Sequence, residues 1–413
     1  MPAPRAVRPL AAVLPALALL VPAAVPAGAG GTATALPPLQ RTAGWSATAS
    51  CPDTPSVDWA HPTVLRDDDA VTVRSYKGRQ QGGRDLKVTV AAAHPGQYRL
   101  VARGASLVGR TRTATGTTAT IPGALVAVNG GYFWRGNVGK EWSKGTQVRD
   151  GRVFYMKAGQ TRYVGVDRAG VVTKGWTKVA GRAVAQADGH GPRVSLPVVA
   201  VNAAPAGNGV AVYTREWNSR NGRSGGAWEV YVRNGVVVAS ATRVRAGLTG
   251  SPAAEDRFVV RGTGSAVARL RQVKVGQPMT YTARAVEQKD GTTVVEATVG
   301  GTTLIVKGKV WIGCSRVPIR PRTMVAWNRY DGRLWLVTAS GGANAARYGM
   351  YVGASYHQMA LIGKRLGASD AVLVDGGGST TMVVRTPAGG LRRVDGPFTS
   401  QRSISDVLAI VPR

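Results

Sequence analysis

The sequence is poor in acidic residues, histidine and cysteine. Its 413 residues contain 22 Asp and Glu against 53 Lys and Arg, with only four His and two Cys. It has no His-Glu-x-x-His and no Cys-x-x-Cys, and the four histidines lie far apart (His61, His94, His190 and His357). We therefore predict neither a metal nor a cofactor.

The signatures of two hydrolase classes are also missing. There is no Walker phosphate loop and no Ser-x-x-Lys pair. These motifs mark nucleotide hydrolysis and penicillin-type acylation. His357 lies in a helical pattern, where we expect a packing or surface role rather than a catalytic one.

Long apolar runs are absent after the N-terminus. The chain begins with basic residues (Met1 to Arg8), continues with a proline-interrupted apolar run (Leu10 to Val25) and reaches the small residues Ala27-Gly28-Ala29. This pattern predicts a cleaved signal peptide, residues 1–29, and a secreted, extracellular protein. The alternative is a membrane anchor, which needs about 20 apolar residues, so no transmembrane anchor is expected.

The two cysteines, Cys51 and Cys314, leave two alternatives open. In an oxidising compartment they form one disulfide, or they remain two buried thiols. Neither alternative carries catalysis.

The formal net charge of +31 is extreme. Such a field attracts polyanions and speeds their encounter, but it does not choose among them. The basic residues are scattered singly, as at Arg99, Arg103, Arg110 and Arg112, rather than gathered into a run. That disfavours a specific nucleic-acid partner, and export favours an anionic cell-wall or envelope glycopolymer.

Five parts are predicted along the chain. Residues 1–29 are the signal peptide, and 30–56 form a linker rich in Gly, Ala, Thr and Pro. Residues 57–174 and 307–413 are two parts of one domain, and 175–306 form a β-rich module inserted between them. The expected fold class is α+β, with a mixed β-sheet core and few helices.

A Gly-rich turn stands between two strand-like runs, Ala371 to Val374 and Met382 to Arg385. The turn reads Asp375-Gly376-Gly377-Gly378-Ser379-Thr380. Its glycines let the backbone turn sharply and approach a ligand, and a carboxylate beside backbone N–H groups suits an anion-handling turn. The alternative is a tight hairpin whose Asp side chain caps its own turn.

A second strand-like run, Ala124 to Val128, also ends in glycines. It continues as Asn129-Gly130-Gly131 and then Tyr132-Phe133-Trp134. This pattern indicates a backbone approach to substrate beside an aromatic wall for a sugar face, or a turn followed by core aromatics. For Asn129 the structural alternative is a turn residue in the left-handed region.

The last hundred residues predict a hairpin and a helix. The hairpin pairs Met324 to Trp327 with Leu334 to Thr338 around an Asp331-Gly332 turn. The helix runs from Ser355 to Leu366 with Ser355 as its cap and ends at Gly367.

Taken in order, these stretches resemble the phosphodiester glycosidase family, which includes the lysosomal uncovering enzyme. The matching segments are Ala127 to Phe133, Pro321-Arg322-Thr323, Ala371 to Met382, and Arg402 followed by Val407 to Val411. The resemblance is close over residues 120–185 and 310–413 and looser between them. Three positions depart from the family pattern: Ser340 replaces an Asp, Gln358 a frequent Glu, and Leu373 a common Asn. These changes mark either another substrate or a protein that binds without cutting.

The resemblance implies a hydrolase that releases a sugar from a sugar-1-phosphate diester. It implies Asp375 as the catalytic carboxylate, Arg322 as a clamp on the phosphate, and Asn129 as a third catalytic residue. The substrate-binding residues expected with them are Gly130, Gly131, Gly376, Gly377, Gly378, Ser379, Thr380, Arg402 and Glu141, the last as a second carboxylate.

Alternatives remain at the level of both residue and protein. An ion pair between Arg322 and Asp375 is the structural alternative to the clamp. A non-catalytic, polyanion-binding wall protein on the same fold is the main alternative to the hydrolase, and a nucleic-acid binder is the least favoured. The natural sugar, the stereochemical course and the oligomeric state stay open.

Overall fold

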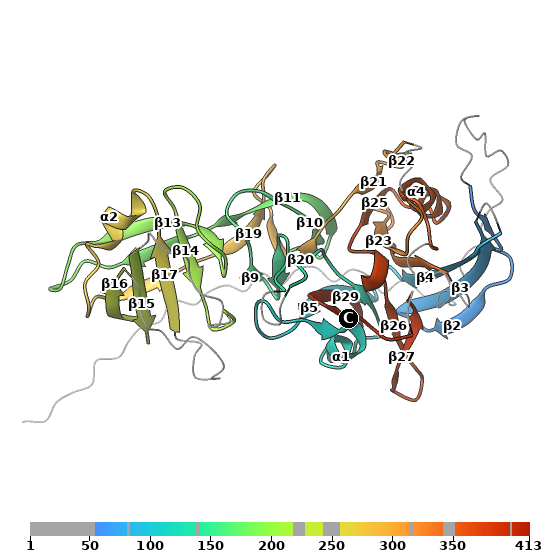
Figure 1. The fold of residues 1–413 in the computed structure, drawn as a ribbon, viewed down its shortest axis with the longest axis horizontal. Helices are drawn as coiled ribbons and strands as arrows, with labels where there is room; N and C mark the ends of the chain where they lie inside the picture. Colours follow the sequence, from blue (N-terminus) through green and yellow to red (C-terminus); the bar gives the residue numbers. More distant parts are fainter. Residues whose placement is uncertain are drawn as a thin grey trace, which may run out of the picture. The chain divides into compact units, whose positions relative to one another are not determined.

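The computed structural model of the chain is built mainly from β-strands (Figure 1). It describes residues 54–80, 83–136, 141–217, 228–242, 257–313, 318–341, 352–396 and 399–413. The predicted signal peptide, nearly all of the predicted linker and both cysteines lie outside these residues. Strands far outnumber helices, which confirms a β-rich chain with few helices but does not separate an α+β fold from a mostly β one.

The largest sheet has nine strands and holds the C-terminal hairpin. Its strand order is β1-β3-β4-β24-β23-β25-β21-β22, with β2 paired to β3. The strands are β1 (Ser56–Val57), β2 (Thr63–Asp67), β3 (Val71–Arg79), β4 (Asp85–Ala93), β21 (Thr303–Val306), β22 (Lys309–Val310), β23 (Arg322–Trp327), β24 (Leu334–Ser340) and β25 (Asp370–Leu373). The predicted hairpin is confirmed as β23 and β24, joined through a turn in which Gly332 has a φ of 73°.

A five-stranded sheet, ordered β27-β26-β7-β29-β5, packs against one face of the nine-stranded sheet. Its strands are β5 (Tyr98–Gly104), β7 (Val126–Asn129), β26 (Met382–Arg385), β27 (Leu391–Asp395) and β29 (Asp406–Pro412). Beside it lie a short pair, β6 (Arg112–Thr113) with β28 (Ser403–Ile404), and the helix α1 (Ala114–Thr118).

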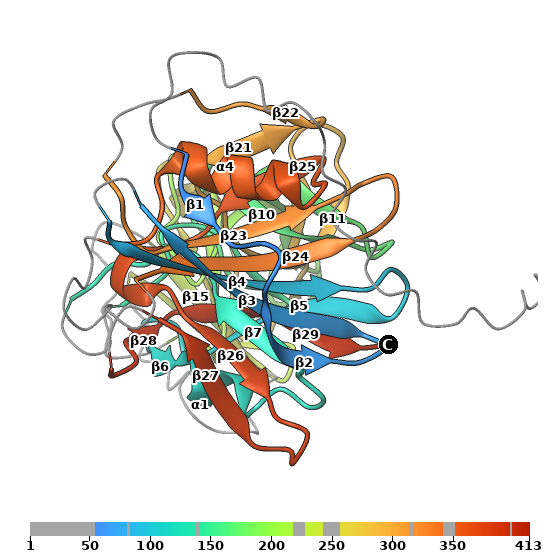
Figure 2. The same cartoon turned by 90° about the vertical axis from the view of Figure 1, so that its right-hand side faces the viewer.

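The central strands of the nine-stranded sheet are buried on both faces, as continuous apolar runs predict. In β23, Val325 faces the core shared with the five-stranded sheet, whereas Met324 faces a second core with α4 (Tyr356–Arg365). Figure 2 shows α4 beside β21 and β23. The chain therefore stacks a helix, a large sheet and a smaller sheet, and the Gly-rich turn links the two sheets.

The predicted C-terminal helix is confirmed as α4. Ser355 is its N-cap and accepts a hydrogen bond from the Gln358 N–H, while the Gln358 side chain accepts one from the Ser355 N–H. Met359 and Ile362 pack into the core beneath the helix, and Gly367 follows its end with a φ of 86°. This reciprocal cap satisfies two N–H groups that a helix start otherwise leaves unpaired.

A six-stranded sheet contains a closed ring of four strands. Its strands are β8 (Gln147–Arg149), β9 (Arg152–Tyr155), β10 (Thr161–Asp167), β11 (Val172–Ala180), β19 (Arg284–Glu287) and β20 (Thr293–Val299). The order is β10-β11-β19-β20-β8-β9, and β10 also pairs with β20, which closes the ring. Asp290-Gly291 joins β19 to β20, with a φ of 76° at Gly291.

Residues 182–281 contribute every strand of a separate seven-stranded sheet. Its strands are β12 (Arg182–Ala185), β13 (Val194–Val201), β14 (Val210–Tyr213), β15 (Trp228–Arg233), β16 (Val236–Ala241), β17 (Arg257–Gly262) and β18 (Met279–Tyr281), with helix α2 (Ala266–Leu270). Strands β20 and β21, which the predicted module also includes, pair with β10 and β25, which lie outside it. The domain boundaries stay a prediction.

The contribution of the Ser355 cap to stability can be tested against a control substitution at another helix start. We expect Ser355→Ala to lower the free energy of unfolding by about 1 kcal/mol in urea titrations, because the Gln358 N–H loses its acceptor. Ser265, the N-cap of α2, makes no side-chain capping bond, so Ser265→Ala is the control and should change stability by under about 0.5 kcal/mol. Equal losses in the two variants would contradict the capping role.

Candidate functional site

The three predicted motifs meet where the nine-stranded and five-stranded sheets join. The Asp375 N–H donates to the Gly130 carbonyl at 3.0 Å, and the Gly377 N–H donates to the Pro321 carbonyl at 2.8 Å. The Val374 N–H likewise donates to the Thr323 carbonyl at 3.0 Å. The ends of β25 and β7 and the start of β23 therefore surround one turn.

The Asn129 side chain binds three segments together. It is fully buried, and its amide Nδ2 donates to the Asp375 carbonyl at 2.7 Å. Its Oδ1 accepts from the Thr323 hydroxyl at 2.6 Å and from the Thr381 N–H at 3.1 Å. Its φ is not positive, so the αL alternative is wrong. Both the oxygen and the nitrogen of the side-chain amide make hydrogen bonds within the protein. Asn129 is therefore a positioning residue for the Asp375 turn.

Gly130 and Gly131 approach a buried carboxylate rather than open space. The Gly131 N–H donates to the Asp406 carboxylate at 2.9 Å and to the Thr298 hydroxyl at 2.7 Å. A Cβ at Gly131 would lie 2.5 Å from that hydroxyl oxygen. Gln147 also donates to Asp406 at 2.9 Å, and burial raises the pKa of Asp406. Asp406 thus anchors the Asn129-Gly130-Gly131 segment from beneath.

The Asp375 carboxyl group is partly buried in this junction. Burial raises its pKa above the ordinary value of 3.8, because removal of water disfavours the charged form. The pKa is held back by the Ser379 side chain, by the Gly376 N–H at 2.9 Å, and by the positive charges of Arg402 and Lys144. A carboxylate with a raised pKa beside cations suits a base or nucleophile that works on an anionic substrate.

Arg322 lies at the start of β23 and is held by neutral partners. Its Nε donates to the Ala354 carbonyl at 3.2 Å, and its Nη2 donates to the Pro318 carbonyl at 2.8 Å. Its guanidinium carbon is 4.5 Å from the centroid of the Tyr356 ring. No ion pair joins Arg322 to Asp375 in the described part of the chain, so that carboxylate does not neutralise the charge of Arg322.

Arg402, which follows the Gly-rich turn in the sequence, lies against it. A Cβ on Gly378 would overlap the Arg402 guanidinium, so the glycine is what allows this close approach. Burial lowers the pKa of Arg402, and the nearby Arg135 lowers it further, while Asp375 raises it. The predicted cation at 402 is therefore brought to the predicted carboxylate at 375.

Two hydroxyl groups of the turn are buried without good partners. Ser379 Oγ and Thr380 Oγ1 are both inaccessible to solvent, and neither makes a hydrogen bond of good geometry within the described residues. Ser379 is still near enough to Asp375 to lower its pKa. Most backbone N–H groups of the turn, by contrast, already have protein acceptors.

Tyr132 closes the site beside Gly301. Its ring carbon and hydroxyl lie within 2.8 Å of where a Gly301 Cβ would stand, and Asp375 and Arg322 both influence its ionisation. Burial raises the pKa of Tyr132 well above its ordinary range. The aromatic segment after Gly131 therefore lines the site at Tyr132 and continues outward to the exposed Trp134.

Glu141 is not brought to the Asp375 turn. Its carboxylate accepts from the Thr111 hydroxyl at 2.7 Å, and its N–H donates to the Gly109 carbonyl. These partners belong to the loop that precedes α1. The role of Glu141 as a second carboxylate stays a prediction.

Two of the three departures from the family pattern, Ser340 and Gln358, have local structural explanations. Ser340 donates a hydrogen bond to the carboxylate of Asp395, and Thr338 donates to the same carboxylate at 2.6 Å. A carboxylate from β27 therefore lies beside the strand position where the family has its own Asp. Gln358 is buried, caps α4 and exchanges amide hydrogen bonds with Gln80. A glutamate at 358 could not donate the 2.8 Å bond to Gln80.

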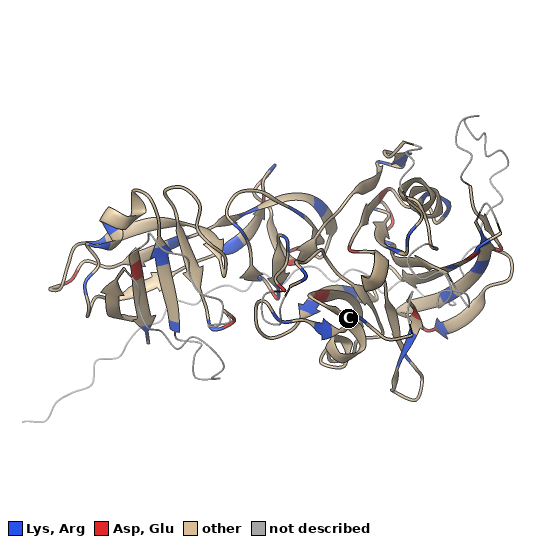
Figure 3. Cartoon of the chain, in the orientation of Figure 1, with Lys and Arg blue, Asp and Glu red and all other residues tan. Residues whose placement is uncertain are grey.

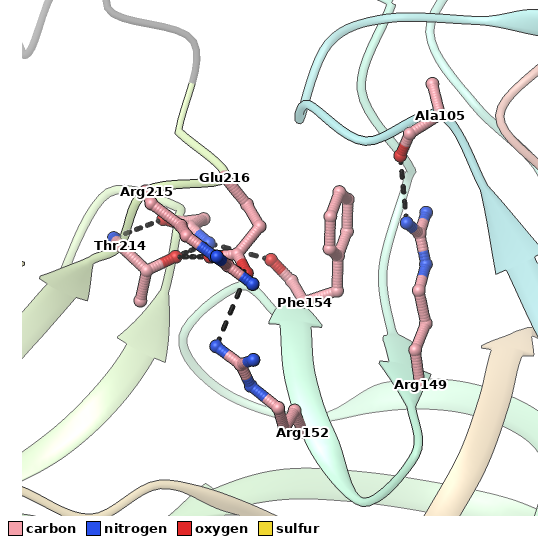
Figure 4. Close-up of polar contacts among 8 residues, drawn as sticks. Ala105, Arg149, Arg152, Phe154, Thr214, Arg215 and Glu216 are labelled. Carbon is pink, nitrogen blue, oxygen red and sulfur yellow. Dashed lines mark hydrogen bonds and ion pairs between the residues drawn. The ribbon is translucent and has the colours of Figure 1, made fainter. Parts of the chain in front are cut away.

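A cavity lies elsewhere in the described part of the chain. It has a volume of about 570 Å³ and is lined by residues that include Arg149, Arg152, Phe154, Glu216 and Tyr281. Figure 4 shows Arg152 directed at Glu216 and Arg149 at the Ala105 carbonyl; the distances are 3.4 Å and 2.8 Å. Its charges are largely paired within the protein, in contrast to those around Asp375.

Sequence reasoning missed Lys144, Arg135 and Asp406. Asp406 stands directly before the apolar run of β29, and a carboxylate at a strand start is a usable signal. Lys144 and Arg135 come from an irregular segment and carry no pattern. Figure 3 shows Lys and Arg spread over the sheets, so charge along the sequence does not mark the site.

No cluster of three His, Cys, Asp or Glu residues is arranged to hold a metal ion in the part of the chain that the structure describes. No described helix has the length and apolar character to cross a membrane.

Residues 223–411 match the model of the phosphodiester glycosidase family. The predicted resemblance is confirmed over this span, which contains the Asp375 turn, Arg322 and Arg402; Asn129 lies before it. No curated protein is similar enough in sequence to count as a match.

Solved structures are similar to the chain in fold. A hypothetical protein from Synechocystis is 20% identical with a TM-score of 0.63, over 86% of this chain and 64% of that one, which is less than two thirds of its length. A Burkholderia pseudomallei protein named as exported is 21% identical with a TM-score of 0.57, over 82% and 77%. The zebrafish N-acetylglucosamine-1-phosphodiester α-N-acetylglucosaminidase catalytic domain is 15% identical with a TM-score of 0.44, over 87% of this chain and 89% of that one.

The Asn129 clamp predicts a loss of stability. We expect Asn129→Ala to lower the free energy of unfolding by about 3 kcal/mol, because it leaves the Thr323 hydroxyl, the Thr381 N–H and the Asp375 carbonyl without partners. Asn208→Ala is the control, since Asn208 accepts only at an exposed turn, and should cost under about 1 kcal/mol. An Asn129→Ala protein with unchanged stability in urea titrations would contradict the clamp.

Proposed function

We propose that this chain, whose residues 223–411 belong to the phosphodiester glycosidase family, is a secreted hydrolase that cleaves a sugar from a sugar-1-phosphate diester. Its substrate is an anionic cell-wall or envelope glycopolymer. The observation that carries the proposal is a partly buried carboxylate, Asp375, that faces the positive charges of Arg402 and Lys144 at the Gly-rich turn. This is the arrangement that cleavage next to a phosphate requires.

In the proposed reaction, the bond between the anomeric carbon and the bridging phosphate oxygen breaks. The phosphate monoester leaves with the electron pair of that bond, and a hydroxyl from water ends on the anomeric carbon. Asp375 either accepts the proton of the attacking water or first bonds to the anomeric carbon and is then released by water. Phosphate is a good leaving group, so the site needs little general-acid assistance.

The other residues have supporting roles in this proposal. Arg322 and Arg402 hold the phosphate oxygens and neutralise the charge that develops as the monoester leaves. Ser379 and Thr380 offer hydroxyl groups that have no good partners in the described protein. Asn129 keeps the turn in place through the Asp375 carbonyl.

A non-catalytic polyanion-binding wall protein is the second candidate. The specific observations in its favour are the contact of Glu141 with Thr111 and the replacement of family acids by Ser340 and Gln358. It shares with the first candidate the exported location and the anionic partner. The two differ only in turnover.

The experiment that separates them measures free reducing sugar from purified mature protein. The substrates are a panel of sugar-1-phosphate diesters and wall glycopolymers, and Asp375→Asn is compared with wild type. We expect release by wild type and at least a hundredfold loss in a folded variant, as catalytic groups of this kind contribute about 10²–10⁴-fold. Tight, salt-sensitive binding without any release would instead support the second candidate.

The raised pKa of Asp375 predicts an acid limb in the pH profile. The carboxylate must be ionised to act, so kcat/KM should rise with pH through a midpoint above 3.8. Lys144 lowers this pKa, so Lys144→Gln should move the limb to higher pH, whereas Lys309→Gln, at an exposed position on β22, should leave it in place. A limb that moves to lower pH in Lys144→Gln would contradict the assignment.

The contact between Gly378 and Arg402 predicts a binding defect. Gly378→Ala should displace the guanidinium, which is the flexible end of a side chain, and should raise KM about tenfold with little loss of stability. Gly390→Ala adds the same methyl group in an open turn and is the control. Unchanged KM in Gly378→Ala would remove Arg402 from the binding site.

A further inference from the structure

Five cations form a strip that begins at the proposed catalytic centre. They are Arg322, Arg402, Arg135, Lys144 and Lys157, and none takes part in an ion pair found among the described residues. Adjacent members repel one another: Arg135 lowers the pKa of Arg402, and Lys144 lowers that of Lys157, in both cases after burial. Like charges that outnumber the one carboxylate among them, Asp375, favour a ligand with several negative charges.

The outer part of the strip is built around Trp134. Lys144 Nζ lies 4.6 Å and Lys157 Nζ lies 5.9 Å from the centroid of its ring. The side chain of Trp134 is nevertheless 50% exposed, so much of the ring remains open to a ligand. A large exposed aromatic side chain flanked by two ammonium groups combines a surface for the face of a sugar ring with donors for a phosphate.

A short antiparallel connection joins this outer part to the centre. The Lys144 N–H donates to the Tyr132 carbonyl at 2.8 Å, and the Trp134 N–H donates to the Trp142 carbonyl at 2.9 Å. The charge of Asp375 raises the pKa of Tyr132, and the charge of Lys144 lowers the pKa of Asp375. The ring of Trp134 therefore stands on the same hairpin-like segment that lines the centre, one step further out.

We propose that Trp134, Lys144 and Lys157 form a second subsite, which binds the next phosphate-bearing sugar unit of a polymeric substrate. The proposal rests on the proposed function, because it places cleavage at Asp375. A substrate with a single phosphate uses Arg322 and Arg402 and leaves the outer lysines without a partner. A chain of sugar phosphates fills both subsites at once.

The cavity at Arg149 does not offer the same excess of charge. There Glu216 pairs with Arg152 and Arg215, and Asp150 pairs with Arg103. The acids there offset part of the positive charge. Of these two places, the Trp134 subsite is the one whose lysines form no ion pair among the described residues.

The test compares a polymer with its single unit. The probes are poly(N-acetylglucosamine 1-phosphate) and the methyl diester of N-acetylglucosamine 1-phosphate, both assayed on the pH plateau above the acid limb. For Trp134→Ala and for the double variant Lys144→Gln/Lys157→Gln, we expect kcat/KM on the polymer to fall about tenfold more than on the methyl diester. Lys274→Gln/Lys289→Gln removes two exposed charges elsewhere and should lower both activities equally, if at all.

Several outcomes would overturn the subsite. Equal losses on the two substrates would place the lysines at the catalytic centre, and equal losses in the control double variant would make the effect one of overall charge. Single-stranded DNA that competes with the polymer as well as the polymer itself would make the strip a general polyanion surface.

A binding measurement separates failure of the subsite from failure of the proposed function. If wild type cleaves neither probe, the function fails while the subsite is still tested by titration calorimetry with the polymer. Weaker polymer binding by Trp134→Ala than by the control then supports the subsite. Unchanged binding removes it.

Discussion

The amide of Asn129 is the interaction on which the site depends. It joins the end of β7 to the start of β23, to the Asp375 carbonyl and to the Thr381 N–H, and so ties the five-stranded sheet to the nine-stranded sheet at one point. The Gly-rich turn crosses between the sheets at the same place. Because every polar atom of the amide has a buried partner, the backbone around Asp375 has one favourable position.

The position of the turn sets the electrostatics of the site. Asp375 is withdrawn from water far enough for its pKa to rise, while Arg402 and Lys144 limit that rise. Arg322 is held by two carbonyls and the Tyr356 ring instead of by an acid, so its charge stays available. The protein has few carboxylates, and most of them lie away from this site. Positive charge therefore exceeds negative charge around Asp375.

The strands, the helix and the Gly-rich turns could be predicted from the sequence because each leaves a local pattern. Ser355 with Gln358 marks the start of α4, and Asp331-Gly332 marks the hairpin. The partners of the turn could not be predicted in the same way. Lys144 reaches Asp375 from an irregular segment, and Glu141, only three residues earlier, instead binds Thr111. The αL role for Asn129 failed because long-range hydrogen bonds decide the conformation of that residue, and they leave no trace in neighbouring residues.

The central claim is that the phosphate of a sugar phosphate binds between Arg322 and Arg402, in front of Asp375. The most direct measurement is a crystal structure of the Asp375→Asn protein with N-acetylglucosamine 1-phosphate. The account predicts phosphate oxygens within hydrogen-bond distance of both guanidinium groups, with the anomeric carbon facing residue 375. A sugar phosphate bound instead in the cavity beside Arg149 and Arg152, with the Gly-rich turn empty, would contradict it.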